Sequence, residues 1–423
     1  GGSGGMSGVI SLTRMPTSGP RRLLVLGFGL LGIMSVVRLI TGYDDLTSSG
    51  TIGAALRLTV PILLAGLAGL WAERVGILNI GIEGMMILGT WFGAFGAWKF
   101  GPWIGLVLAV LGGMLGGAIH AVATIRFNID QVISGVVMNL LALYGMRYLS
   151  ELAFDGVPQG GISQSPPQSG AIPRIDVPFL SGGWSTPDIL GWFEERGWFL
   201  IGDLAGIIRG LTTNLSLASL LAVLLVPASA WVLWRTTFGL RLRSSGESPE
   251  SAESLGVDVI RIRYLGLLIS GGFAGLGGGF LAIVSSSYYR QGQTAGRGFI
   301  GLATMIFGNW RPSGVLGGAA VFGYSEGLKL VAGGSVTGLF LFIAIVAGLV
   351  LVASLVARRS RRGVTALITT GVAMLAYLTV DEVPESLTQS LPYVVTLVVL
   401  ATASQRLRPP ARAGVPYRPG GSH

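Results

Sequence analysis

Charged side chains set among apolar residues are the best candidates for chemistry in this chain. Glu83 lies within NIGIEGMMILG and Arg297 within TAGRGFIGLAT. A lone charge in hydrocarbon costs about 2.5 to 3.5 kcal/mol on the insertion scale, so such groups pair with another charge or face water. Asn79 adds an amide that can donate and accept hydrogen bonds close to Glu83. These three residues are predicted to line a polar pathway or to form a structural ion pair.

Residues suited to catalysis or metal binding are scarce. The chain has no Cys and two His, His120 and His423, which excludes disulfides, thiolate catalysis and Cys-ligated metal. No G-x-x-x-x-G-K-[ST] phosphate-binding loop occurs, and no paired acids or nucleophile elbow stands out. We therefore predict no catalytic residue, no metal and no cofactor, and we expect that the chain is not an enzyme.

The composition places these residues in a membrane protein. Of 423 residues, 51% are hydrophobic and 12% charged, the mean hydropathy is +0.68, and a soluble domain carries about 25% charged residues. The 68 glycines suit close helix packing in lipid. The net charge of +9 comes largely from arginines beside apolar runs, which favours membrane lipid over nucleic acid as a partner. The sequence predicts an all-α polytopic membrane protein.

Stretches free of Asp, Glu, Lys and Arg mark the expected crossings, each of which needs about 20 helical residues. The long stretches are Phe100–Ile125, Leu211–Trp234, Tyr264–Tyr289, Leu330–Ala357 and Ser386–Gln405, and the shorter ones are Leu23–Val37, Leu58–Ala72, Gly84–Trp98, Gln131–Gly145, Pro312–Ser325 and Gly363–Val380. Gly298–Trp310 is too short to span alone and is expected to belong to a broken helix. We predict roughly ten to twelve transmembrane helices.

The arginines set the expected orientation, with both termini of a multi-pass membrane protein in the cytoplasm. No cleavable signal peptide is evident, and GGSGG before Met6 has the composition of a tag remnant. The predicted regions are the tag remnant and cytoplasmic N-terminus (1–21), a first transmembrane half (22–150), an extracytoplasmic segment (151–211), a second transmembrane half (212–405) containing a cytoplasmic loop (236–263), and a basic cytoplasmic tail (406–423).

The extracytoplasmic segment is expected to contain one amphipathic helix. Ser185 or Thr186 is predicted to cap it, and Pro187 suits its first position. Trp192 and Trp198 lie near acidic residues in this stretch. Such a helix either rests at the level of the lipid headgroups or offers a docking surface to an external partner.

Two distant stretches of the chain resemble each other. Each carries a charge between glycines, Gly81 and Gly84 around Glu83 and Gly296 and Gly298 around Arg297, and each then reaches Phe-Gly-x-Trp followed by a basic residue. In the expected topology the two stretches run in opposite directions, which is typical of the inverted repeats of transporters. The glycines are predicted to break the helices there. Chance similarity between Gly-rich stretches is the alternative.

The cytoplasmic loop is predicted to contain a short, exposed helix of about two turns. Ser248 is a suitable N-cap, Pro249 fits the first position and Gly256 fits the residue after the helix end. Glu250 and Ala252 precede Gly256 with the spacing E-x-A-x-x-x-G. A solvated loop helix without further function is the alternative.

Four stretches together carry a family resemblance, and they are GILNIGIEGMMILG, GLRLRSSGESPESAESLGVDVIRIRYLGLLISGGFAGLGGGFL, TAGRGFIGLATMIFGNWRPSG and LPYVVTLVVLATASQRLRPPARAGVPY. Spread between about Ile52 and Tyr417, they resemble the permease subunit of nucleoside and simple-sugar ABC importers, in the same broad family as the ribose and branched-chain amino-acid importer permeases. The turn-rich outer segment is less usual for that family.

The resemblance implies a transmembrane subunit of the inner (cytoplasmic) cell membrane that forms the pathway for a nucleoside or simple sugar. It implies that Glu250, Ala252 and Gly256 couple the chain to cytoplasmic ATP-binding subunits, which would hold the ATP and Mg²⁺. A second permease subunit and an extracytoplasmic substrate-binding lipoprotein are the other implied partners. An ion-coupled secondary transporter is the alternative; it would need no coupling helix, and its transport would proceed without ATP.

Overall fold

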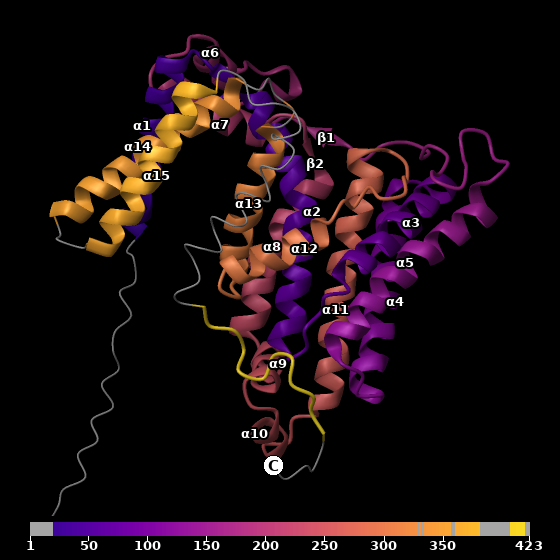
Figure 1. Cartoon of the computed structure of the whole chain (residues 1–423). Coiled ribbons are helices and arrows are strands. Elements are labelled where there is room, and N and C mark those ends of the chain that lie inside the picture. The colour runs from indigo at the N-terminus through magenta and orange to yellow at the C-terminus, as the bar shows by residue number, and fades with distance from the viewer. Residues whose placement is uncertain (1–19, 329, 331–333, 357–359, 381–406, 419–423) are drawn as a thin grey trace, which may run out of the picture. The chain divides into compact units, whose positions relative to one another are not determined.

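The computed structural model describes residues 20–328, 330, 334–356, 360–380 and 407–418 (Figure 1). Helices dominate these ranges, and one short antiparallel ribbon pairs β1 (Arg174–Ile175) with β2 (Leu215–Ser216). The predicted tag remnant and the predicted crossing Ser386–Gln405 lie outside the described residues.

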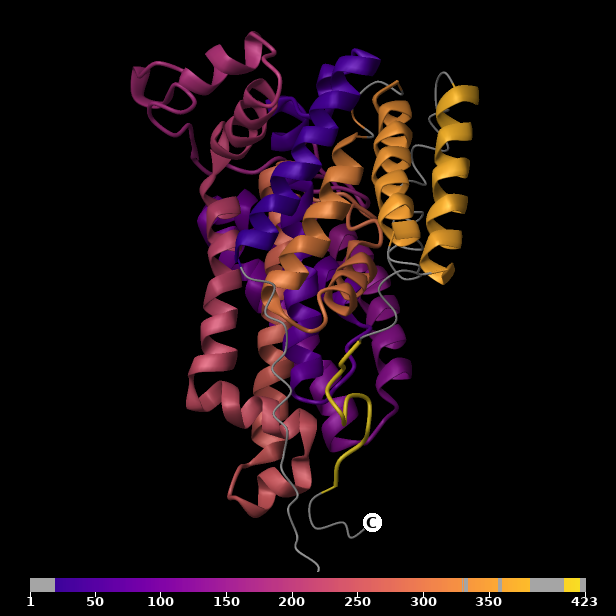
Figure 2. The ribbon, with the colours of Figure 1, turned by 90° about the vertical axis from the view of Figure 1, so that its left-hand side faces the viewer.

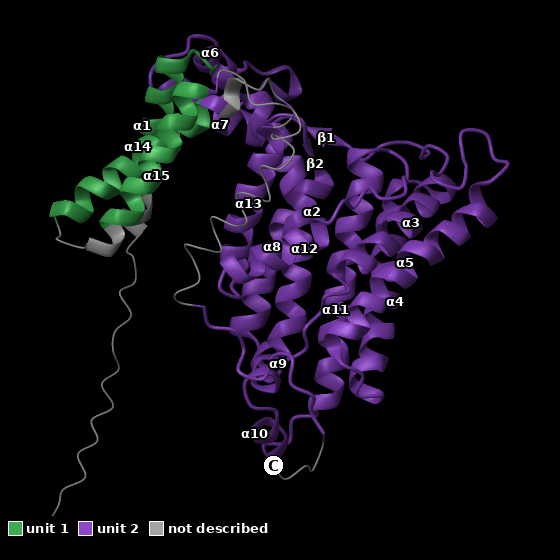
Figure 3. Ribbon diagram, in the orientation of Figure 1, with its two compact units in different colours: residues 1–43, 338–379 green, residues 44–337, 380–423 purple. Residues whose placement is uncertain are grey.

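The chain divides into two compact units (Figure 3). Residues 1–43 and 338–379 form one unit, which contains α1 (Pro20–Thr41), most of α14 (Gly334–Val356) and α15 (Ser360–Thr379). Residues 44–337 and 380–423 form the other. It contains η1 (Asp44–Leu46), α2 (Ser49–Arg74), α3 (Ile82–Phe100), α4 (Pro102–Ala121), η2 (Val122–Arg126), α5 (Gln131–Phe154), η3 (Gly183–Ser185), α6 (Ile189–Glu195), α7 (Ile201–Thr212), α8 (Leu217–Arg235), α9 (Thr237–Glu247), α10 (Pro249–Ser254), α11 (Val259–Phe280), η4 (Leu281–Ser285), α12 (Arg297–Phe307) and α13 (Pro312–Leu328).

Six helical stretches of the described chain are long and apolar enough to cross a membrane, namely Asp44–Arg74, Pro102–Arg126, Gln131–Phe154, Leu217–Arg235, Val259–Ser285 and Thr337–Val356. Gly27–Thr41, Arg297–Phe307 and Gly363–Thr379 are shorter apolar helices. The predicted all-α polytopic membrane protein is confirmed. The count of ten to twelve crossings stays a prediction, because length alone does not assign the shorter helices.

Helices α2 and α11 form the centre of the second unit. Inside their most apolar windows 72% and 78% of the residues are buried, against 22–44% in the other four candidate spans. Small residues allow α4 to approach α11 closely, because a Cβ added at Gly113, Gly271 or Gly275 would overlap the backbone of the facing helix. The glycine-rich run of α11 therefore serves packing, as the composition predicted.

The two ends of this unit carry different structures. The β-ribbon, α6 and α7 lie at one end, and α9 and α10 lie at the other in both views (Figures 1 and 2). The predicted outer helix begins later than expected, at Ile189, and its cap is Asp188, whose carboxylate accepts from Gly191 N at 2.7 Å. The prediction of Ser185 or Thr186 as cap and Pro187 as first residue was wrong. A carboxylate caps a helix well, and Asp188 also pairs with Arg209 at 2.6 Å.

Candidate functional site

The two stretches that resemble each other meet at the beginnings of α3 and α12. Glu83, in the first turn of α3, accepts hydrogen bonds from two backbone amides at the start of α12. Its Oε1 lies 2.9 Å from Gly296 N, and its Oε2 lies 2.7 Å from Gly298 N. A carboxylate is favoured there because the first N–H groups of a helix lack partners and the helix dipole is positive at that end. Glu83 thus acts as a cap supplied by a distant helix.

Glycine is required on the α12 side of this contact. Gly296 has φ +76°, in the left-handed region that favours glycine. A Cβ added at Gly298 would lie 2.7 Å from Glu83 Cα and from Glu83 N, closer than real side chains come. Gly296 occupies the N-cap position, directly before the first residue of α12, and the breaking of a helix at these glycines stays a prediction. Gly298 serves the close approach of α3.

Arg297 pairs with Glu326 of α13 rather than with Glu83. Arg297 Nη2 lies 3.0 Å from Glu326 Oε2, and the two side chains are 15% and 12% exposed. Arg297 Nη1 also donates to Gln293 O at 3.2 Å. The ion pair of Arg297 is therefore with a neighbouring helix, and the lining of a polar pathway by Arg297 stays a prediction.

Asn79 lies just before α3 and is fully buried. Its Nδ2 donates to Ser270 Oγ of α11 at 3.0 Å, and no hydrogen-bond partner for its Oδ1 is found among the described residues. Its amide therefore ties the α2–α3 connection to the central helix α11 and keeps one acceptor unused.

Gly81 and Gly84 bring the start of α3 against α5. A Cβ at Gly84 would lie 2.7 Å from Met138 O, and Gly84 N donates to Asn139 Oδ1 at 2.7 Å. Asn139 Nδ2 donates in turn to Ile80 O at 3.1 Å. The start of α3 is thus held by the side chain of Asn139 from α5, by Ser270 of α11 through Asn79, and by backbone amides of α12 through Glu83.

The loop helix α10 has the predicted boundaries. Pro249 is its first residue, Ser248 occupies the N-cap position without a capping hydrogen bond from its side chain, and Gly256 follows the end with φ +82°. Gly256 N donates to Glu253 O at 2.8 Å and Val257 N to Ala252 O at 3.0 Å. These two bonds form a Schellman motif, which ends a helix at a left-handed glycine.

The residues of α10 and its end differ in how far they are exposed. Ala252 is 2% exposed and packs with Val259 of α11 and Tyr417. Leu255, directly after the helix, is 84% exposed. Glu250 Oε1 lies 3.6 Å from Arg412 Nη2. Of the three predicted coupling residues, Ala252 faces the protein interior, while Glu250 is paired and Gly256 shapes the end of the helix.

The family of the chain follows from comparison with known proteins. The family model described as the permease component of the branched-chain amino acid transport system matches residues 51–355. The chain belongs to this family. No solved structure matches it.

Three relatives within this family are named for the solutes that they transport. The guanosine ABC transporter permease protein NupQ of Bacillus subtilis is 35% identical over 68% of this chain and 83% of its own length. The nucleoside ABC transporter permease protein NupC of Lactococcus lactis is 30% identical over 85% and 93%. The putative glucose ABC transporter permease protein TsgC13 of Haloferax volcanii is 34% identical over 67% and 78%. The resemblance seen in the sequence is confirmed.

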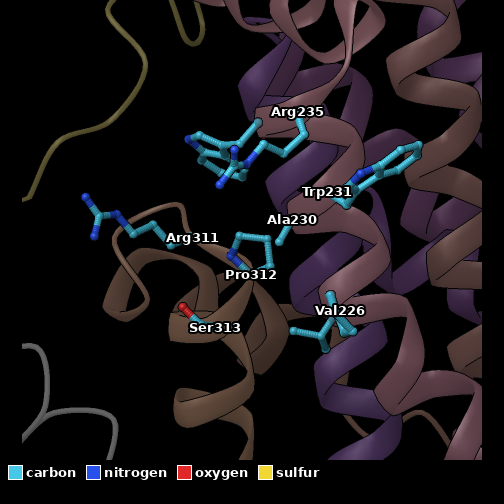
Figure 4. A pocket seen from close by; sticks show the side chains of 9 residues that line it. Val226, Ala230, Trp231, Arg235, Arg311, Pro312 and Ser313 are labelled. Carbon is cyan, nitrogen blue, oxygen red and sulfur yellow. The ribbon is translucent and has the colours of Figure 1, made fainter. Parts of the chain in front are cut away.

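The permease also has a groove between α8 and the start of α13, with a volume of about 710 Å³ (Figure 4). Val226, Ala230 and Trp231 contribute to an apolar wall, while Arg235 and Arg311 add two guanidinium groups. This groove was not predictable from the sequence, because α8 and α13 are far apart along the chain.

Several residues of the permease that the structure brings to the site were not predicted from the sequence. Glu326 could have been found, because it is the lone charge of the apolar run that becomes α13. Asn139, Ser270 and Tyr417 carried no such signal, since uncharged polar residues are common in every membrane helix and tail.

Proposed function

We propose that this permease forms the translocation pathway of an ABC importer for a nucleoside or simple sugar and is coupled to ATP hydrolysis through α10. Relatives named as guanosine, nucleoside and glucose permeases support this solute class.

The geometry of α10 is the observation that carries the coupling role. It is a short helix fixed at its end by Gly256, with Ala252 anchored inward and Leu255 projecting outward. A partner can hold such a projecting side chain in a pocket and push the helix as a unit. The pathway helix α11 begins five residues after α10 ends, at Val259, so movement of the loop reaches the centre of the bundle directly.

The partners follow from this role. ATP-binding subunits would dock on the α10 side and would hold the ATP and Mg²⁺, since the sequence has no phosphate-binding loop of its own. A second permease subunit would complete the pathway, and a substrate-binding lipoprotein would deliver solute at the opposite end, beside α6 and α7. In this arrangement α10 and both termini lie in the cytoplasm.

Reconstitution tests the proposal against ion-coupled transport. The permease, with the ATP-binding, second permease and binding-protein subunits encoded beside it, is placed in liposomes, and uptake of labelled guanosine and glucose is measured with and without ATP. We expect that one of the two solutes is taken up, and that this uptake occurs only when hydrolysable ATP is present. Uptake by the permease alone, driven by a proton or sodium gradient without ATP, would contradict the proposal and would show that the protein is a secondary transporter.

A further inference from the structure

Residues 407–418 lie against the end of the second unit that carries α9 and α10 (Figure 1). This segment has turns but no helix or strand, and it passes the ends of several helices that are distant in sequence. Four backbone amides of the segment donate hydrogen bonds to these ends, from Arg408 to Asn309 Oδ1 (2.8 Å), from Ala411 to Glu247 Oε2 (3.1 Å), from Arg412 to Gly246 O (2.9 Å) and from Gly414 to Gly76 O (3.2 Å).

Tyr417 is the main side-chain anchor of the segment. It is 7% exposed and packs with Ala252 of α10 and Val259 of α11. Arg263 of α11, 3% exposed, lies over its ring at 5.2 Å. Arg263 Nε and Nη2 have no hydrogen-bond partner in the described part of the chain. The ring is therefore an important partner of this buried cation, through a cation–π contact.

Charge adds a second contact between the segment and α10. Arg412 Nη2 lies 3.6 Å from Oε1 of Glu250, in the first turn of α10. Burial and the carboxylates of Glu253 and Glu250 raise the pKa of Tyr417 above its ordinary value, so its hydroxyl stays neutral. The segment thus contacts α10 from its first turn to its buried face.

Helix α10 needs outside support to hold one orientation. It has six residues, its N-cap makes no side-chain hydrogen bond, and its buried side chains are Pro249 and Ala252. A helix this short is unstable by itself, because nucleation costs more than its few hydrogen bonds return. Its position must come from tertiary contacts, and one side of its buried residue Ala252 is covered by Tyr417.

We propose that segment 407–418 is a clasp that fixes α10 against α9 and α11, with Tyr417 and Arg412 as positioning residues for energy coupling. This inference rests on the proposed coupling role of α10. The clasp keeps Leu255 pointing outward from a rigid base, so that force from an ATP-binding subunit moves α11 instead of bending the loop. The segment contributes to transport without touching the solute.

A spin label on α10 tests the clasp directly. The chain has no Cys, so Ser254→Cys gives a single labelling site on an exposed position of α10. In lipid, Tyr417→Ala should increase the mobility of the label, while Tyr417→Phe should leave it unchanged because the ring remains. Arg412→Ala should have a smaller effect in the same direction, and Arg418→Ala, at an exposed neighbouring position, is the matched control.

Uptake by the reconstituted complex tests the role of the clasp in coupling. We expect Tyr417→Ala to lower ATP-driven guanosine or glucose uptake about tenfold, a typical size for coupling between two sites, at normal abundance and with the ATP-binding subunits still attached. Tyr417→Phe should retain uptake.

The outcomes separate the clasp from the proposed function. A label that stays immobile in Tyr417→Ala would overturn the clasp itself, and a mobile label with normal uptake would overturn its role in coupling. If Tyr417→Phe made the label mobile and also abolished uptake, the aromatic ring would not be the anchor. Absence of ATP-driven uptake by the unaltered complex would overturn the proposed function and, with it, the coupling role.

Discussion

At the residue scale, the carboxylate of Glu83 and the guanidinium of Arg297 have separate partners although they belong to matching stretches. Glu83 accepts from the backbone at the start of α12, and Arg297 reaches on to Glu326 of α13. The contact of α3 with α12 therefore depends on one carboxylate and on the absence of a side chain at Gly298.

A double-mutant cycle tests the Arg297–Glu326 pair. Arg297→Gln and Glu326→Gln should each destabilise the protein, because each leaves a part-buried charge without its partner. The double variant should recover part of the loss, with a non-additivity of about 0.5 to 3 kcal/mol in unfolding titrations. A cycle between Glu83 and Arg297 should give a smaller value. A larger interaction in that second cycle would contradict the pairing.

Gly298→Ala tests the close approach of α3 to α12. The added Cβ would lie 2.7 Å from Glu83 Cα, so α12 must move away and the two amide bonds to Glu83 lengthen. We expect a lower thermal unfolding temperature and loss of uptake. Gly317→Ala in α13 is the control, because nothing lies within 4 Å of its Cβ and alanine favours a helix by about 1 kcal/mol over glycine. Equal behaviour of the two variants would refute the contact.

At the scale of elements, α10 is defined by local signals at both ends but positioned by its neighbours. Nine residues, from Ser248 to Gly256, determine where the helix starts and ends. The two Schellman hydrogen bonds at Gly256 form at the predicted end. Its buried face, by contrast, depends on Val259 and Tyr417. Changes at the helix end and changes at the clasp should therefore affect coupling while leaving the membrane helices intact.

Gly256→Pro tests the element itself. Proline removes the N–H that bonds Glu253 O and fixes φ near about −65° where the chain needs +82°. We expect loss of ATP-driven uptake with normal membrane abundance, and the same from Glu250→Arg, which puts a positive charge at the positive end of the helix and beside Arg412. Gly156→Pro, at a similar left-handed glycine (φ +74°) after the end of α5, is the control for proline at such a position. Normal uptake by both loop variants would remove α10 from the coupling path.

At the scale of the whole molecule, the permease combines a glycine-packed bundle with a small polar centre. Helices α2 and α11 are buried along most of their length, which leaves little freedom for a deep, preformed binding site between them. In the proposed importer, a solute delivered by a binding protein needs only weak contacts with the permease, since tight binding would slow its release.

We therefore predict that the permease alone binds guanosine and glucose weakly. Isothermal titration of the purified chain in nanodiscs should give no saturable binding at solute concentrations below the millimolar range. A Kd of about 1 mM corresponds to a binding free energy of about −4 kcal/mol. The same titration with the substrate-binding lipoprotein is the positive control. Tight, ATP-independent binding of a nucleoside by the permease alone would contradict this and would favour a secondary transporter.

The sequence by itself determined the class of the protein and the local limits of its loop helix. Sparse charge and long apolar runs require membrane helices whatever their arrangement, and four ordered motifs were enough for the family. Pro249 and Gly256 act within one or two turns, so no distant partner was needed to place the ends of α10. The cap of the outer helix was not decided locally, because Ser185, Thr186 and Asp188 all suit an N-cap and the ion pair with the distant Arg209 favours Asp188. The inverted repeat stays a prediction.

Only the tertiary structure decided which polar groups meet. Glu83 and Gly298 are 215 positions apart, and Arg297 and Glu326 lie on different helices. A charge in an apolar run indicates that a partner is needed. The energy of pairing is similar for any opposite charge or free amide within reach, so the partner could not be predicted from the sequence. Tyr417 is the extreme case, since an aromatic residue in a basic, proline-rich segment gives no local sign that it covers Ala252 and Arg263.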